Sequence, residues 1–140
     1  MKLSLYYITC LFTLLFVSCK DDDNPVVDYA YHAHIMQPSS ADKQIGDVMF
    51  IQVEFESHTG ENIEHINIRI FNKNTNIIVY DKPSDPHIGH NGDNYDYEDQ
   101  ITLSAANGFS EGDWVIEAKV WGAEHEQDLE TESVEFHIHN

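Results

Sequence analysis

The residues most able to do chemistry in this 140-residue sequence are its nine histidines. Four of them form two His-x-His pairs, His32-Ala33-His34 and His137-Ile138-His139. In a β-strand, residues i and i+2 point to the same face roughly 6.5 to 7 Å apart, so the two imidazoles of a pair can converge on one metal ion. Met36 extends the first pair along the same face, and a thioether adds a preference for copper(I). The pairs therefore predict a transition-metal site, and polar histidines on exposed strands are the alternative.

A second set of histidines falls in segments that an immunoglobulin-like strand order would gather at one end of a sandwich. Asp85 and Asp93 lie near these histidines and add oxygen ligands. Calcium is less favoured, because Asp85, Asp93, Asp96 and Asp99 lack the regular spacing of an EF-hand loop. Histidines that are merely polar loop residues are the alternative. The predicted loop-end cluster consists of His58, His65, His87, His90 and His125.

The sequence contains no recognisable catalytic motif. His125-Glu126 is followed by Gln127-Asp128-Leu129, so the HExxH pattern of zinc proteases is absent. No serine or cysteine lies in a nucleophile elbow, and there is no glycine-rich phosphate loop. We therefore expect a protein that is not an enzyme.

Three apolar residues are predicted to point away from the core, namely Val48, Phe50 and Trp121. Exposed apolar patches often mark contact surfaces. The alternative to a metal-binding protein is therefore a metal-independent module for adhesion, glycan binding or protein interaction, with a partner that the sequence does not specify.

Short strands must position these residues. Residues 112–122 alternate as a central strand with one face in a core, and most other apolar runs alternate in the same way. The predicted inward face of 112–122 is Trp114, Ile116, Ala118 and Val120, and the outward face is Val115, Glu117, Lys119 and Trp121. The pattern predicts an all-β chain with a single immunoglobulin-like or fibronectin-like β-sandwich of about seven strands. A seven-stranded sandwich of another topology is the alternative. The predicted strands are residues 29–36, 48–56, 63–71, 77–80, 95–103, 112–122 and 131–139, with 105–111 as a connection.

The first residues have the features of a secretory signal. Lys2 precedes an almost wholly apolar run, Leu3 to Val17, which at about 15 residues is short for a membrane-spanning helix of ~20. The run ends in LFVSC, which resembles the lipobox of bacterial lipoproteins, where cleavage leaves Cys19 as the lipid-modified first residue. The predicted divisions are a lipoprotein signal peptide at 1–18, a disordered acidic tether at 19–27 and the β-sandwich domain at 28–140.

Charge adds expectations about location and partners. The acidic run Asp21-Asp22-Asp23 after Cys19 resembles the signal that sends Bacteroidota lipoproteins to the outer face of the outer membrane. We expect an outer-membrane lipid anchor with the domain at the cell surface, and a periplasm-facing anchor is the alternative. The formal net charge of −18 repels phosphate backbones, so nucleic acid is not an expected partner. Neighbouring carboxylates should also raise the pKa values of histidines.

Several stretches resemble one family. YHAHIMQP, DWVIEAKVWG and the closing VEFHIH are similar to segments of small histidine-rich Bacteroidota lipoproteins of unknown function, the DUF4625-type lipoprotein family. The resemblance runs from Tyr31 to His139 and implies an immunoglobulin-like fold without an established activity. In that family histidine is common on the outward face of the second strand, where this chain has Phe50 and Gln52.

Together these features lead us to expect a lipid-anchored cell-surface protein that binds a divalent transition metal, zinc or copper, through its histidine clusters. The expected partners are the membrane, through the lipid on Cys19, and the metal ion.

Overall fold

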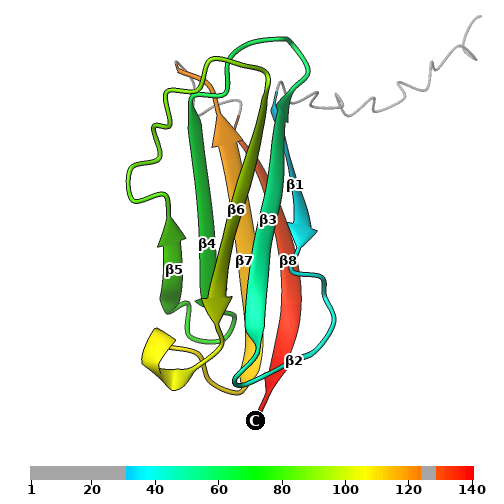
Figure 1. Cartoon of the computed structure of the whole chain (residues 1–140), viewed down its shortest axis with the longest axis vertical. Coiled ribbons are helices and arrows are strands. Elements are labelled where there is room, and N and C mark those ends of the chain that lie inside the picture. The colour runs from blue at the N-terminus through cyan, green and yellow to red at the C-terminus, as the bar shows by residue number, and fades with distance from the viewer. Residues whose placement is uncertain (1–30, 124–128) are drawn as a thin grey trace, which may run out of the picture.

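The computed structural model describes residues 31–123 and 129–140. Two β-sheets pack face to face (Figure 1). Sheet A has the order β1-β3-β6, with β1 at Tyr31–Gln37, β3 at Val48–Ser57 and β6 at Asn94–Thr102. Sheet B has the order β2-β8-β7-β4-β5, and a 3₁₀ turn, η1, lies at Ala105–Asn107. The strands of sheet B are β2 (Lys43–Gln44), β4 (His65–Asn72), β5 (Ile78–Lys82), β7 (Gly112–Trp121) and β8 (Glu130–His139).

This arrangement confirms the predicted all-β, immunoglobulin-like sandwich. Each predicted strand is present within the described residues, with ends that differ by a few positions. The described part holds one further strand, β2, in which Lys43 pairs in parallel with Ile138. Two polar residues show no alternation, so no sequence pattern could predict β2.

The predictions for the signal peptide, Cys19 and the tether fall in residues 1–30, outside the described residues. Between Tyr31 and Asn140, apart from 124–128, no helix has the length and apolar character needed to cross a bilayer.

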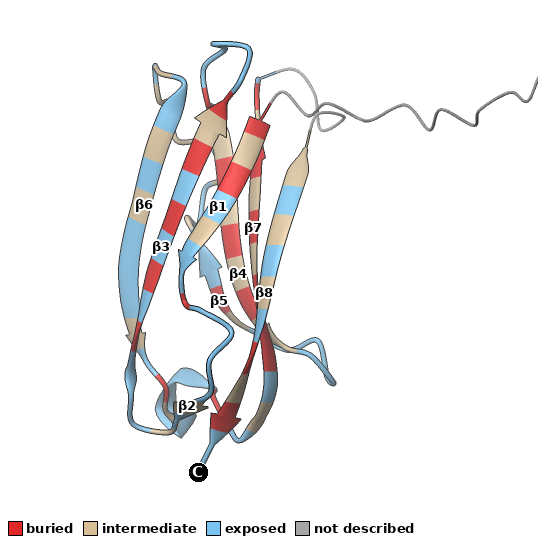
Figure 2. Ribbon diagram, turned by 90° about the vertical axis from the view of Figure 1, so that its right-hand side faces the viewer, coloured by how far each residue is buried: buried red, intermediate tan, exposed pale blue. Residues whose placement is uncertain are grey.

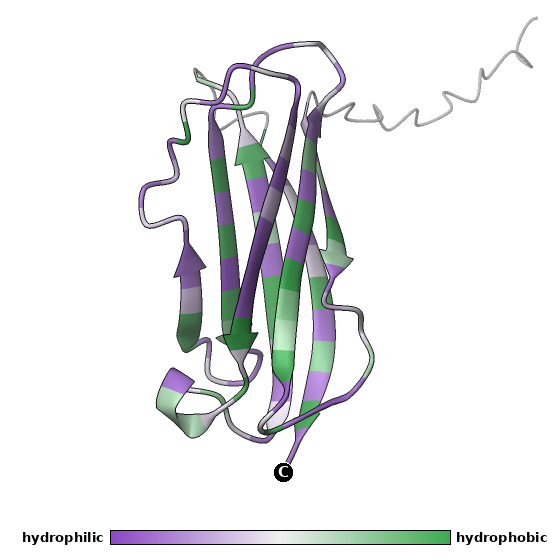
Figure 3. Cartoon of the chain, viewed as in Figure 1, coloured by the Kyte–Doolittle hydropathy of each residue, from purple (hydrophilic) through white to green (hydrophobic). Residues whose placement is uncertain are grey.

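The core lies between the two sheets, and Figure 2 shows buried residues alternating with more exposed ones along β3 and β4. In Figure 3 the same alternation appears in hydropathy, most plainly along β4. The predicted inward face of β7 is buried throughout, from Trp114 to Val120. Val115 was predicted to face outward, yet only 8% of it is exposed. The reason is its place in the middle of sheet B, where Phe71 and Glu135 flank it on the two neighbouring strands.

The predicted hairpin after β4 is also present, because β4 pairs antiparallel with β5. The side-chain oxygen of Asn72 accepts hydrogen bonds from the backbone N–H groups of Asn74 and Thr75, both at 3.1 Å. Asn76 follows with φ of 57°, a left-handed conformation that asparagine tolerates better than most residues. The hairpin returns the chain along β4 toward the end of the sandwich that carries His65 and His87.

Carboxylates of sheet B satisfy the free edge of β1. The backbone N–H of Ala33 donates to Glu130 Oε2 at 3.2 Å, and that of Ile35 donates to Glu132 Oε2 at 2.7 Å. An edge strand otherwise leaves such N–H groups free to pair with another chain. Acidic side chains of β8 therefore protect this edge and join the two sheets.

Candidate metal centre

The described histidines form three groups, of which the pair of His137 and His139 is as predicted and the other two differ from the predicted groups. The His65 site consists of Glu64, His65 and His87. The His32 cluster consists of His32, His34 and His58 with Glu56. The His137 pair consists of His137 and His139. His90 belongs to none of these groups, and His125 lies outside the described residues.

Backbone pairing places His65 beside His87. Ile66 N–H donates to the carbonyl of Pro86 at 3.0 Å, and Ile88 N–H donates to the carbonyl of Glu64 at 2.9 Å. These two hydrogen bonds flank the antiparallel bridge between His65 and His87. In such a non-hydrogen-bonded pair the Cα atoms approach to about 4.5 Å, and the side chains lie closer than in the other kind of pair. The two imidazole centroids are accordingly 5.0 Å apart.

Trp121 flanks His65 on the opposite side. It is the last residue of β7 and pairs in register with His65, and the two rings stack at 5.2 Å with an interplanar angle of 9°. Trp121, His65 and His87 therefore form a row across three neighbouring segments. Trp121 was predicted to be an exposed contact residue, but it is half-buried because His65 stacks on its indole ring.

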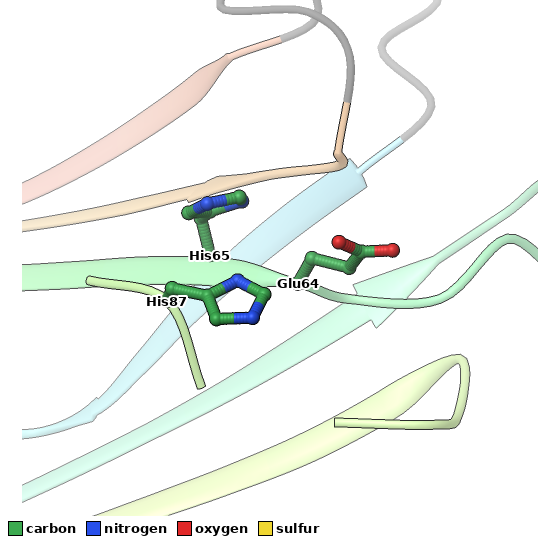
Figure 4. Close-up of side chains that lie close together, drawn as sticks. All are labelled: Glu64, His65 and His87. Atoms are coloured by element: carbon green, nitrogen blue, oxygen red, sulfur yellow. The ribbon is translucent and has the colours of Figure 1, made fainter. Parts of the chain in front are cut away.

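Figure 4 shows the side chains of Glu64, His65 and His87, which come from two segments of the chain. One ligand atom from each lies within 4.8 Å of the other two. A tetrahedral zinc ion with bonds of about 2.0 to 2.1 Å places its ligand atoms about 3.3 Å apart. Small side-chain rotations would therefore bring all three onto one ion.

The ligand set has a clear chemical preference. Two imidazoles and one carboxylate suit zinc or copper(II), and three protein ligands leave one tetrahedral position open. Nδ1 of His65 is buried and has no hydrogen-bond partner among the described residues. His87 is exposed whereas Glu64 and His65 are partly buried, so an ion can enter from the His87 side. The negative charge of the chain also favours a cation over an anion.

The loop that carries His87 is fixed on both sides of the histidine. Asp85 Oδ1 accepts the backbone N–H of His87 at 3.0 Å, and Ile88 packs against the hydrophobic core. Further along, the carbonyl of Gly92 accepts the N–H of the fully buried Ile63 at 3.0 Å. The position of His87 is therefore held by the protein itself.

Sequence reasoning missed Glu64. Its only signal is that it directly precedes His65, and an isolated glutamate beside a histidine is common. In a regular strand neighbouring residues point to opposite faces, but Glu64 lies in the irregular residues just before β4. Its carboxylate is therefore able to turn toward the same ion as His65.

His58 was predicted to join the loop-end cluster, but the structure places it with His32 and Glu56. Glu54 and Glu56 point outward from sheet A, and His58 continues this alternation one residue past the end of β3. Its Nε2 lies 3.1 Å from Glu56 Oε1, and its ring centroid lies 4.2 Å from that of His32. Because Glu56 is opposite His32 in the register, His58 joins the strand pair of β1 instead of the loop histidines.

His90 is also separated from the His65 site. Nε2 of His90 lies 2.8 Å from the carbonyl oxygen of Asn94, and its ring packs edge-on against Tyr95 at 5.1 Å. Met36, which was predicted to extend the pair of His32 and His34, is 61% exposed near the end of β1, where the register with β3 shifts between Ile35 and Gln37. Of the predicted loop-end histidines that the structure describes, it brings together His65 and His87.

In the His137 pair the two ring centroids lie 4.6 Å apart, yet each imidazole has its own carboxylate. His137 Nδ1 lies 2.7 Å from Asp113 Oδ1, and His139 Nε2 lies 3.0 Å from Asp42 Oδ2. The hydrogen bond with Asp113 raises the pKa of His137, and the hydrogen bond with His139 lowers the pKa of Asp42. The expectation that carboxylates raise histidine pKa values is confirmed for His137.

No protein-family model matches this sequence, and no curated protein matches it significantly. Solved structures with similar folds include the CARDB domain of a Pyrococcus furiosus protein in complex with di-metal ions, at 10% identity and a TM-score of 0.44, covering 78% of this chain and 91% of that one. A family 123 glycoside hydrolase from Clostridium perfringens matches at 11% identity and a TM-score of 0.47, covering 79% of this chain and 27% of the hydrolase. The C-terminal domain of wzt has the same identity and TM-score, covering 79% of this chain and 71% of that one. At these identities the likeness concerns the fold alone.

Proposed function

We propose that this protein binds a divalent transition-metal ion, zinc or copper, through Glu64, His65 and His87. The observation that carries the proposal is the convergence of their three ligand atoms within 4.8 Å of one another. The backbone bridge between His65 and His87 adds support, because it aligns the two imidazoles without help from an ion. The sequence motifs favour binding over catalysis, and the net charge of −18 disfavours a nucleic-acid partner.

Isothermal calorimetry of the purified full chain, kept in a mild detergent, tests the proposal with zinc and copper(II). His87→Ala and Glu64→Gln should each remove or strongly weaken one binding event, whereas His90→Ala serves as the matched control and should leave the titration unchanged. A metal concentration of 100 times the Kd should stabilise the fold by about 2.7 kcal/mol. Binding should fade near pH 5, since a histidine ligand must be neutral and its ordinary pKa is about 6.5. Absence of both heat and thermal shift at micromolar metal would refute the assignment.

We further propose that the chain is anchored in the outer membrane through a lipid on Cys19 and faces the cell surface. The supporting features are the apolar run, the LFVSC motif and the acidic residues that follow it. Cells that express the chain should incorporate labelled fatty acid into it, and Cys19→Ser should abolish the label. External protease should remove the domain from intact cells, whereas protection from the protease would favour the periplasm-facing alternative.

A metal-independent adhesion or interaction module is the second candidate. Val48 and Phe50 point outward from β3 as predicted and are 51% and 58% exposed. Under this alternative, Phe50→Ala should abolish binding of a protein or glycan partner, and chelation should leave that binding unchanged.

A further inference from the structure

Three imidazoles gather on the outer face of sheet A, away from Glu64, His65 and His87. His32 and His34 project from β1, and their rings lie 6.3 Å apart with an interplanar angle of 9°. His58 approaches from the residue after β3, with its centroid 4.2 Å from that of His32. Neither strand alone could supply all three rings, so the pairing of β1 with β3 creates the cluster.

One carboxylate oxygen joins two of these histidines. Glu56 Oε1 lies 3.0 Å from Nε2 of His34 and 3.1 Å from Nε2 of His58. The two contacts place one carboxylate oxygen between the imidazoles of His34 and His58. A carboxylate between two imidazoles adds an oxygen ligand to the imidazole nitrogens for a divalent cation.

The third histidine is held with one nitrogen free. His32 Nδ1 lies 2.9 Å from Glu130 Oε2, and an ionised carboxylate can only accept, so the proton is on Nδ1. Nε2 then carries the lone pair; it is buried and has no hydrogen-bond partner among residues 31–123 and 129–140. Glu130 is itself fixed, because it also accepts the backbone N–H of Ala33. Carboxylates commonly hold metal-binding histidines in this way, with the other nitrogen directed to the ion.

We infer that His32, His34, His58 and Glu56 form a second site for a divalent transition-metal ion, with Glu130 as the positioning residue for His32. In the metal-free protein, Glu56 links the two exposed imidazoles that would bind the ion. When the ion binds, His34 and His58 exchange their contacts with Glu56 for bonds to the metal, and any proton on a ligating nitrogen is released to solvent. Three imidazoles and a carboxylate oxygen suit zinc or copper(II).

The second site shares no ligand with the His65 site, so each can be tested with the other removed. Zinc stoichiometry is measured by calorimetry on the full chain, and the geometry is measured by the visible spectrum of the cobalt(II)-loaded protein. The variants are His58→Ala for the second site, His87→Ala for the first, and His90→Ala as the control. His58 has a side chain that is 53% exposed, so its loss should leave the fold intact, which thermal unfolding without metal verifies.

The wild-type chain should bind two zinc ions, each single-site variant one, and the double variant none. Glu130→Gln should weaken the second site by about 10- to 100-fold and leave the first unchanged, as expected for a positioning residue. If His58→Ala leaves the stoichiometry and the cobalt spectrum unchanged, the second site is refuted. If one ion is lost with His58→Ala but none with His87→Ala, the second site stands and the function proposed for the His65 site fails.

A measurement on the wild-type chain checks the assignment without substitution. Substoichiometric copper(II) should broaden the imidazole NMR signals of His32, His34 and His58 before that of His137. Broadening of His137 first, with no effect on these three, would overturn the proposal.

Discussion

Replacing Tyr80 with phenylalanine should loosen the seam at which β5 of one sheet meets β6 of the other. The hydroxyl of the buried Tyr80 donates to Asp99 Oδ2 at 2.6 Å. The hydroxyl oxygen of Tyr97 lies 2.7 Å from the hydroxyl oxygen of Tyr80. Burial, followed by the hydrogen bond with Asp99, raises the pKa of Tyr80, so the phenol keeps its proton at all ordinary pH values. With that proton directed to Asp99, the hydroxyl of Tyr97 donates to the oxygen of Tyr80.

The stability lost in Tyr80→Phe depends on how far the two hydrogen-bonded residues, Tyr80 and Asp99, are buried. A hydrogen bond to a charged group contributes about 1.5 to 3 kcal/mol. Asp99 is exposed, so water can replace the lost donor, and the value should lie at the low end. Phenylalanine keeps the ring and opens no cavity at Tyr80. We therefore expect Tyr80→Phe to lower the free energy of unfolding by about 1.5 kcal/mol, which corresponds to roughly 6 °C in Tm for a domain of this size.

The loss of stability caused by Tyr80→Phe should also depend on pH. The hydrogen bond from Tyr80 is the largest cause that lowers the pKa of Asp99 below its ordinary value. A carboxyl whose pKa is lowered by folding stabilises the protein above its unfolded pKa of about 3.9, and this contribution is lost as pH falls through the folded pKa. The difference between wild type and Tyr80→Phe should thus be full at pH 7 and shrink below about pH 4.

Urea unfolding of wild type, Tyr80→Phe, Asp99→Asn and the double variant measures the coupling directly. Tyr95→Phe is the matched control, because Tyr95 lies on β6 with Asp99 and its hydroxyl makes no hydrogen bond within the described residues. A loss below about 0.5 kcal/mol, or the same loss when Asp99 is already asparagine, would refute the reasoning.

Two further predictions concern a turn and a histidine. Gly108→Ala should destabilise the fold by about 1 to 3 kcal/mol or more, because φ is +86° and the new Cβ would lie 2.8 Å from Val79 Cγ1. Gly46→Ala is the control for backbone strain without a clash, because its φ is +102° and no atom lies within 4 Å of the new Cβ. Equal losses of stability in urea unfolding would show that the contact with Val79 contributes nothing. The pKa of His137, measured by NMR, should exceed its ordinary value and return toward it in Asp113→Asn. Because folding raises the pKa of His137, the contact with Asp113 stabilises the fold fully below about pH 6.5, and this contribution is lost as pH rises through the folded pKa. An unchanged pKa of His137 in Asp113→Asn would contradict the assigned cause.

The strands and their faces could be predicted because alternation is a local property. The spacing of Trp114, Ile116 and Val120 alone predicts a buried face, and all three are buried in the structure. The same rule, extended two residues past Glu56, would have placed His58 on the outer face of sheet A. His58 was correctly predicted to lie in the turn after this strand. It was wrongly grouped with the other loop histidines, because side-chain alternation continues beyond the last ladder residue and directs His58 toward His32.

The pairing of His65 with His87 could not be predicted in detail from local pattern. It depends on how the chain from Pro83 to Gly89 returns along β4, where β5 pairs up to Ile68 opposite Lys82 and a new bridge forms at His65. No residue in that stretch specifies this register by itself. The anchor is Ile88, whose packing against the core becomes evident only in three dimensions.

Glu130 shows why the acidic character of this chain and its histidine chemistry belong together. Its carboxylate accepts the N–H of Ala33 at the free edge of β1 and also contacts Nδ1 of His32. The same group that prevents the edge from pairing with another chain therefore also fixes which nitrogen of His32 is free to bind. A substitution at Glu130 should therefore affect both the edge of the sheet and the second metal site that we propose at His32. Binding of an ion at His32 should in turn hold Glu130 against β1, which strengthens the contact between the two sheets.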